Sequence, residues 1–300
     1  MIFKSILKKL SYILIPVLFF FISYFVDWNL LFLSLKEIDI LLFIFSISIT
    51  LIYPLIGTFR WQSISRSFEV SISFWNALRA VMVAFSANLV APAKTGDFIK
   101  AYSSKVDNKK ENLASSVILE RVIDLISLGL LGFLGAFFLN SSVFLFLNLS
   151  LVLAIISIIF CVTLFSEKLT SFFKNKISEV LIKSLDVRKT NSSFLIKTLF
   201  FSFSNWILGG IQTWLFFSCL NTDISLLVVL SIFPATVLIS ILPITPGGLG
   251  VRESGFIFMF LSYASSHIST LVSLFYYIFV ILFLGFIGLF FTYYVFKKIN

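Results

Sequence analysis

The stretch "LPITPGGLGVRESG", residues 242–255, interrupts a region rich in Phe, Leu, Ile and Ser. Pro243 and Pro246 remove backbone N–H donors and end a helix. Gly247 and Gly248 permit tight turns and a close approach of the backbone to another group. Backbone groups freed by such a break cannot face lipid, so they must face protein, water or a ligand. The stretch therefore predicts a broken helical element whose interruption lies inside the protein.

The composition around this break is typical of a membrane protein and excludes a soluble globular one. The chain is 59% hydrophobic and 12% charged, with a mean hydropathy of +1.06, whereas soluble domains carry about 25% charged residues. We predict one all-α domain, residues 1–300, folded as a polytopic helical membrane bundle of about eight segments. The six full spans are expected at about 10–26, 38–57, 117–139, 143–165, 194–220 and 269–295, and the two broken or re-entrant elements at 74–92 and 225–262.

The distribution of basic residues predicts the orientation. The net charge of +9 is spread over alternate loops, which is the positive-inside pattern and does not indicate nucleic-acid binding. Both termini, 94–112 and 166–193 are expected on the cytoplasmic side of the cell (inner) membrane, where lysines attract anionic lipid headgroups. In this scheme the second span is followed by the cytoplasmic residues Arg60 and Arg66.

The same rule predicts how the two broken elements are inserted. Basic residues flank 74–92 at both ends, so this element should enter and leave on the cytoplasmic side. Asp223 and His267 flank 225–262 in charge-poor loops, so this element should enter from outside, break near 243–250 and return; two full crossings remain the alternative. Discontinuous segments in the two halves of a chain are typical of transporter sites, although no convincing internal sequence repeat is present.

The Lys-rich stretch 166–193 is weakly amphipathic. It predicts either a helix on the cytoplasmic membrane surface or an ordinary solvated linker helix.

Arg252 and Glu253 begin the helix that follows the opening stretch. Free amides at a helix N-terminus favour an anion, Arg252 adds a full positive charge, and Glu253 can orient it or pair with another cation. The arrangement is typical of a site for an anionic group such as phosphate, formed together with Gly247 and Gly248. The alternative is a turn at the membrane interface, with the Arg252 side chain extended to the headgroups.

A second candidate cluster lies in "NLVAPAKTGDFIKAY", residues 88–102, where Asn88 precedes a proline and a Gly-Asp turn. Asp97 is placed either to cap the following helix or to serve a polar site. Lys94 and Lys100 could hold a phosphate as point charges.

A third cluster lies in "SSVILERVIDLISL", residues 115–128. Glu120, Arg121 and Asp124 occupy an apolar helix, and Glu120 and Asp124 share one face because they are four residues apart. Ionisable residues within a span usually face the interior and serve function, and their partner here is expected to be Arg252 or Lys100. The alternative is a structural ion-pair cluster near the cytoplasmic interface.

The sequence shows no enzyme signature. No catalytic residue, metal-ligand spacing or cofactor motif is present, so we predict no metal and no cofactor. One enzymatic interpretation remains, in which Glu120 and Asp124 form the acid/base pair of a transferase.

Four motifs resemble the flippase-like family, also called the lysylphosphatidylglycerol synthase transmembrane region. They are "FRW" at 59–61, "NLVAPAKTGDFIKAY" at 88–102, "LERVIDL" at 119–125 and "PITPGGLGVRES" at 243–254. The family usually has arginine where Lys100 stands, so this chain keeps the charge there without a forked donor. The resemblance implies a polytopic inner-membrane protein related to domains that move an aminoacylated phospholipid between leaflets. Lysyltransferase activity is not expected, because family members with that activity add a soluble domain and this chain ends at Asn300 just after its last predicted span.

The leading functional prediction is therefore a lipid transporter or flippase-like protein that binds or moves an anionic, aminoacylated or glycosylated lipid headgroup. The alternative is an accessory subunit of a glycosyltransferase or lipid-modifying pathway. Membrane lipids are the expected partners, together with a separate transferase enzyme.

Overall fold

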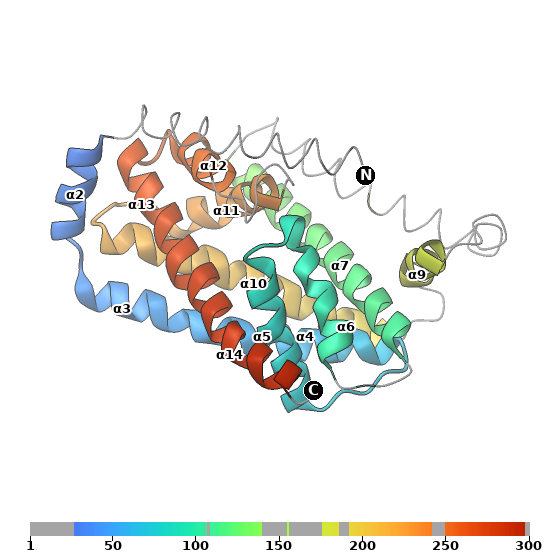
Figure 1. Ribbon diagram of the computed structural model, residues 1–300. Coiled ribbons are helices and arrows are strands. Elements are labelled where there is room, and N and C mark those ends of the chain that lie inside the picture. The colour runs from blue at the N-terminus through green and yellow to red at the C-terminus, as the bar shows by residue number, and fades with distance from the viewer. Residues whose placement is uncertain are drawn as a thin grey trace, which may run out of the picture.

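In the computed structural model, the described residues are 27–104, 106, 109–139, 155, 176–185, 192–241 and 250–297. Every regular element in these ranges is helical, which confirms the predicted all-α class (Figure 1). The elements are α2 (Trp28–Lys36), α3 (Ile40–Ser48), η1 (Ile49–Ile52), α4 (Tyr53–Ser67), α5 (Phe74–Asn88), η2 (Pro92–Phe98), α6 (Ile99–Ser103), α7 (Lys110–Phe138), α9 (Lys176–Leu185), α10 (Ser192–Cys219), α11 (Leu226–Ile241), α12 (Val251–Phe260), α13 (Ser266–Tyr276), the π-helical η5 (Tyr277–Leu282) and α14 (Phe283–Lys297).

Three continuous helical stretches among the described residues are long and apolar enough to cross a membrane. They are Ile40–Ser67, Ser192–Cys219 and Ser266–Tyr294, of 28, 28 and 29 residues. They correspond to the predicted spans at 38–57, 194–220 and 269–295, but the first continues well past its predicted end. The predicted span at 117–139 falls on the 29-residue α7. The predicted spans at 10–26 and 143–165 lie outside the described residues.

Hydrogen bonds between loops define two ends of the bundle. At the end called here the basic end, Lys109 Nζ donates to the Glu69 carbonyl at 2.7 Å and Lys183 Nζ donates to Asn112 Oδ1 at 2.8 Å. At the opposite end, Asn221 Nδ2 donates to the Glu37 carbonyl at 2.9 Å. The described loops are therefore grouped as the charge pattern predicts, with those near 69, 109 and 183 together and those near 37 and 221 together.

The first broken element is a helical hairpin that starts and finishes at the basic end. Helix α5 runs inward from Phe74 to Asn88, and η2 and α6 pack back against it. Gly96 permits this close return, because a Cβ there would lie 2.6 Å from Asn88 Oδ1 and 2.7 Å from the Ala87 carbonyl carbon. We call α5, η2 and α6 hairpin 1.

The second broken element is a hairpin that starts and finishes at the opposite end. Helix α11 leads inward from Leu226, and α12 packs against both α11 and α13. The α12 terminus returns to the opposite end, where the Phe260 ring lies 4.9 Å from that of Phe217. We call α11 and α12 hairpin 2; the intervening residues 242–249, including Pro243, Pro246, Gly247 and Gly248, lie outside the described residues.

The order of elements repeats in opposite directions. A long helix (α3 to α4), hairpin 1 and α7 are followed by a long helix (α10), hairpin 2 and the helix from α13 to α14. Each hairpin packs closely on the final helix of the other half, α5 on α14 and α11 on α7. Glycine is required at both crossings, because a Cβ on Gly288 would overlap the Met82 carbonyl and one on Gly135 would overlap the Ser231 backbone. Small residues at such points are typical of membrane helix packing.

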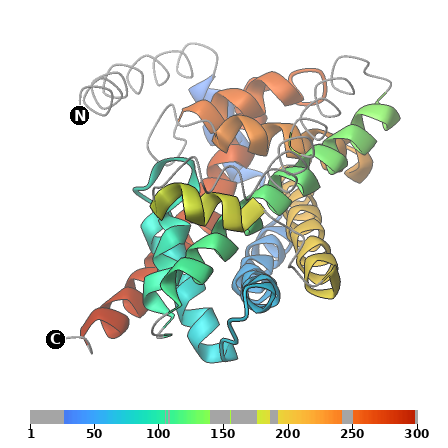
Figure 2. The same cartoon turned by 90° about the vertical axis from the view of Figure 1, so that its right-hand side faces the viewer.

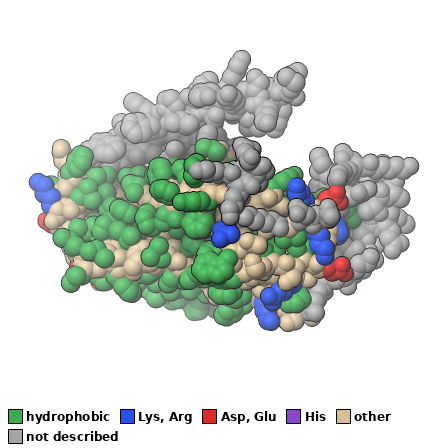
Figure 3. Space-filling view, turned by 60° about the horizontal axis from the view of Figure 1, so that its bottom comes forward, with side chains coloured by type: hydrophobic (Ala, Val, Ile, Leu, Met, Phe, Trp, Pro, Cys, Tyr) green, Lys and Arg blue, Asp and Glu red, His purple; other side chains and the backbone are tan. Residues whose placement is uncertain are grey.

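The surface agrees with a membrane location. Large apolar side chains are exposed along the long helices, among them Leu41, Phe200 and Phe290. Figure 3 shows an apolar face on which the described charged side chains lie mostly toward its two ends.

Helix α9, the described part of the stretch 166–193, lies across the basic end (Figure 2). It packs on α7, where Ser115 Oγ donates to the Val180 carbonyl at 3.3 Å and Ile182 is buried. One face of α9 is therefore buried against α7, and its placement at a membrane surface stays a prediction.

Candidate functional site

A cavity of about 180 Å³ lies where the two hairpins meet the long helices. Its lining comes from α4, from hairpins 1 and 2, from α7 and α10, and from the stretch around η5. Eight charged side chains line it, five of them cations and three of them carboxylates: Arg60, Lys94, Lys100, Arg121 and Arg252, with Asp97, Glu120 and Asp124.

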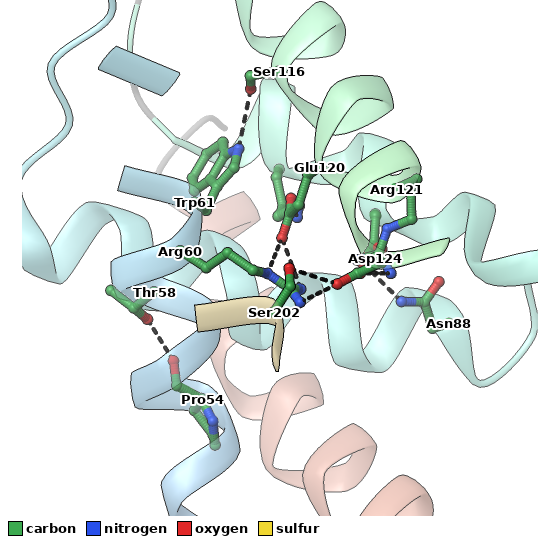
Figure 4. Close-up of polar contacts among 12 residues, drawn as sticks. Pro54, Thr58, Arg60, Trp61, Asn88, Ser116, Glu120, Arg121, Asp124 and Ser202 are labelled. Atoms are coloured by element: carbon green, nitrogen blue, oxygen red, sulfur yellow. Dashed lines mark hydrogen bonds and ion pairs between the residues drawn. The ribbon is translucent and has the colours of Figure 1, made fainter. Parts of the chain in front are cut away.

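Glu120 is the centre of a buried ion-pair network and is fully buried. Its Oε1 accepts from Arg60 Nε at 2.8 Å (Figure 4). Its Oε2 accepts from Lys100 Nζ at 2.5 Å. Arg60 belongs to α4 and Lys100 to α6, so this one carboxylate joins hairpin 1 to two long helices. The sequence predicted Arg252 or Lys100 as the partner of the cluster formed by Glu120, Arg121 and Asp124, and the structure confirms Lys100.

Asp124 and Asp97 extend the network around Arg121. Asp124 accepts from Arg60 Nη1 at 2.6 Å, from Arg121 Nη1 at 2.9 Å and from Ser202 Oγ of α10 at 2.9 Å. Asp97 pairs with Arg121 and accepts from Asn88 Nδ2 at 2.9 Å. Because buried charges require compensation, these contacts hold hairpin 1 against α4, α7 and α10.

The prediction for Arg60 is wrong, and one of the two alternatives for Asp97 is excluded. The structure buries Arg60 to 7% exposure inside the network, whereas the sequence placed it after the second span, among cytoplasmic residues. The reason is that α4 continues to Ser67, so Arg60 lies within the long helix. Asp97 does not cap α6, because that helix has no side-chain cap and the Asp97 carboxylate is occupied by Arg121 and Asn88.

Arg252 and Glu253 are both buried at the start of α12. The Arg252 guanidinium lines the cavity and lies 5.2 Å from the centre of the Tyr277 ring in η5. Glu253 Oε2 accepts from the Gly250 backbone N–H at 2.6 Å and so caps the helix, and Glu253 is not part of the cavity lining. Gly250 has a φ of 80°, a left-handed conformation that glycine adopts without strain.

Lys94 lies in the turn of hairpin 1, with its Nζ 4.7 Å from the centre of the Trp206 ring of α10. Its φ of 56° is in the left-handed region, where a non-glycine residue costs about 1–3 kcal/mol. Such strain is typical of residues positioned for a function, and here the strained backbone places a lysine at the cavity.

The cavity brings together most of the site residues predicted from the sequence. Seven of them line it: Asn88, Asp97, Lys100, Glu120, Arg121, Asp124 and Arg252. Glu253 lies beside them as a helix cap, and Gly247 and Gly248 lie outside the described residues.

Among the further lining residues that were not in the predicted site are Arg60, Asn205 and Trp206. The "FRW" motif at 59–61 was the available signal for Arg60, because a family motif that contains a charge within a helix suggests a buried role. Asn205 and Trp206 sit in an apolar span with no flanking motif, and only packing places them at the cavity.

Comparisons with known proteins match most of the chain to one family. A family model described as lysylphosphatidylglycerol synthase TM region matches residues 9–291. A UPF0104 membrane protein of Methanocaldococcus jannaschii is 30% identical over 188 residues, which cover 57% of this chain and 77% of that protein. A UPF0104 membrane protein of Pyrococcus horikoshii is 27% identical over 256 residues, which cover 72% of this chain and 75% of that protein.

Proposed function

The chain belongs to the lysylphosphatidylglycerol synthase transmembrane region family, and from that premise we propose that its cavity binds the anionic headgroup of a membrane lipid and passes it between the leaflets. The observation that carries the proposal is the cavity itself, which places eight charged side chains inside a bundle with an apolar exterior. A single charge at the bilayer centre costs about 2.5–3.5 kcal/mol on insertion scales. Charged side chains along an interior path offset that cost, because they replace the water that the headgroup loses when it enters the membrane.

The two hairpins supply a route for alternating access. We infer that both termini are cytoplasmic, that hairpin 1 re-enters from the cytoplasmic side and that hairpin 2 re-enters from outside. The inverted order of elements supports this, because transporters with inverted repeats bind substrate between broken helices and rock one half against the other. The close crossings of α5 on α14 and of α11 on α7 couple each hairpin to the other half.

The acyl chains are expected to stay in the bilayer while the headgroup enters the cavity. The cavity volume of about 180 Å³ is below the roughly 300–1,000 Å³ of pockets that enclose drug-sized ligands. It therefore favours a headgroup of few atoms over a glycan.

The purified protein in proteoliposomes tests this proposal. Vesicles carry a trace of anionic phospholipid with a reporter on one acyl chain, and a membrane-impermeant reagent reads how much is in the outer leaflet. We expect the protein to accelerate exchange between leaflets at least about tenfold over protein-free vesicles, because it removes a charge-transfer barrier of a few kcal/mol. Exchange at the protein-free rate for every anionic lipid tested would refute transport and favour the accessory-subunit alternative.

A further inference from the structure

Most of the charges that line the cavity are balanced within the protein. Each of the three lining carboxylates pairs with at least one of the cations Arg60, Lys100 and Arg121. Arg252 has a counter-charge in the next residue, Glu253, which is buried beside it and attracts it electrostatically. The guanidinium of Arg252 can therefore donate hydrogen bonds to a ligand without adding a surplus charge to the cavity.

Lys94 is the exception among the described residues of the lining. It forms no ion pair with a described carboxylate, and its Nζ lies 4.7 Å from the centre of the Trp206 ring. An aromatic face attracts a cation without neutralising its charge. Asp97 and Asp124 act on Lys94 from farther away, but the arginines that pair with these two carboxylates oppose their effect. The charge of Lys94 is therefore available to a ligand.

Trp206 adds a hydrogen-bond donor at the same point. It is 4% exposed and lines the cavity, and its indole N–H has no acceptor among the residues that the structure describes. A buried donor without an acceptor is unfavourable, and a ligand oxygen would satisfy it. Because Lys94 lies over the same ring, the two free oxygens of one phosphodiester group can contact both side chains.

We propose that Lys94 and the Trp206 N–H form a phosphate subsite in the cavity, and that this subsite selects phospholipids whose headgroup carries no cation. The inference rests on the proposed headgroup-binding function and specifies its substrate class. A phosphate bound there offsets the charge of Lys94 and accepts from the indole N–H. The amine of a zwitterionic or aminoacylated headgroup would restore the surplus positive charge, and the lining carboxylates are already engaged by arginine and lysine.

The two groups of the subsite should affect binding in different ways. The Lys94 charge responds to the net charge of the headgroup, so it separates lipids with an amine from lipids without one. The Trp206 N–H contacts a phosphate oxygen, which every phospholipid has. Loss of the Lys94 charge should therefore change the preference between lipids, whereas loss of the indole N–H should weaken the binding of all of them alike.

Competitive binding at pH 7 tests the selectivity. A tail-labelled phosphatidylglycerol is bound to the purified protein in mixed micelles of a non-ionic detergent. Unlabelled phosphatidylglycerol or phosphatidylethanolamine with matched acyl chains then displaces it. For the wild type we expect phosphatidylglycerol to compete at least about tenfold better, which is about 1.4 kcal/mol. Lys94→Gln should reduce this ratio to within about threefold, because the surplus charge that disfavours the amine is removed.

Three variants accompany this experiment. Trp206→Phe keeps the ring under Lys94 and removes the N–H, so it should weaken both lipids several-fold and leave their ratio unchanged. Lys94→Arg keeps the charge and should retain most of the preference. The matched control is Lys110→Gln, which removes an exposed lysine that also lies over an aromatic ring, that of Tyr102, but does not line the cavity. It should keep the wild-type ratio and affinity.

The outcomes separate the possible failures. Equal competition by the two lipids in the wild type overturns the selectivity, whether or not the variants fold, and leaves headgroup binding in place. A wild-type ratio in folded Lys94→Gln protein, with folding checked by thermal unfolding, also overturns it. Wild-type affinity in folded Trp206→Phe protein removes the indole N–H from the subsite. No displacement by either lipid overturns the proposed function itself. Displacement by soluble glycerophosphoglycerol as effectively as by phosphatidylglycerol overturns the lipid assignment.

Discussion

Replacement of Glu120 by alanine is expected to destabilise the protein by about 3–5 kcal/mol, because removal of one partner from a buried ion pair leaves uncompensated charge. The residue is fully buried, and its carboxylate neutralises Arg60 and Lys100 together. Arg60 keeps Asp124 as a second partner, whereas Lys100 retains only the Trp61 ring, 5.5 Å from its Nζ, among its contacts in the described chain. Hairpin 1 should therefore separate from α7 first.

Denaturant titration of the purified protein in detergent measures this loss. Glu111→Ala is the matched control, since Glu111 is exposed in the first turn of the same helix and surface charges contribute about 0–1 kcal/mol. A double variant, Lys100→Met with Glu120→Leu, should recover part of the stability, because neither charge is then buried alone and Arg60 still pairs with Asp124. A Glu120→Ala protein as stable as the Glu111→Ala protein would show that the network does not hold the hairpin.

The Arg252→Ala protein is expected to fold and insert but to lose transport, with exchange reduced at least about tenfold toward the protein-free rate. Arg252 is the only hairpin 2 residue with a formal positive charge in the described lining of the cavity. Its loss leaves the anionic headgroup without a cationic partner on that side. The helix start is preserved, because the cap is formed by Glu253 and Gly250.

Arg252→Lys should retain part of the transport, because the charge is kept while the forked donor geometry is lost. The matched control is Arg79→Ala, which removes an exposed arginine of α5 that does not line the cavity. The leaflet-exchange assay reads all three variants, and thermal unfolding confirms that each is folded. Wild-type exchange of every anionic lipid by the Arg252→Ala protein would remove Arg252 from the mechanism.

Much of the fold could be predicted from the sequence, because the bilayer imposes simple rules. Apolar length identified the helices now seen at Ile40–Ser67, Ser192–Cys219 and Ser266–Tyr294. The basic flanks of 74–92 and the charge-poor flanks of 225–262 predicted two elements inserted from opposite faces of the membrane. The described parts of both pack as helical hairpins at opposite ends of the bundle, and their re-entrant insertion stays a prediction. Both signals are local in the chain and independent of packing.

The features that were missed depend on contacts between distant segments. Arg60 follows an apolar stretch like an interfacial arginine, and only its pairing with Glu120 and Asp124 explains its burial. For Asp97 the sequence left a helix cap and a polar site as alternatives, and only its pairing with Arg121 of another helix decides between them. The two halves share an inverted order of elements but no recognisable sequence repeat. This order depends on small residues at single helix crossings, such as Gly135 and Gly288, and isolated small residues do not make a visible repeat.

The central claim is that the cavity between the hairpins is a site for a lipid headgroup. A cryo-electron microscopy map of the protein in nanodiscs that contain phosphatidic acid tests it most directly. The account predicts density for a phosphate inside the cavity, about 2.7–2.9 Å from the Arg252 guanidinium nitrogens, with the acyl chains leading out between helices to the bilayer. A cavity without phosphate density, in a map that shows lipid phosphates only in the two headgroup layers around the protein, would contradict it.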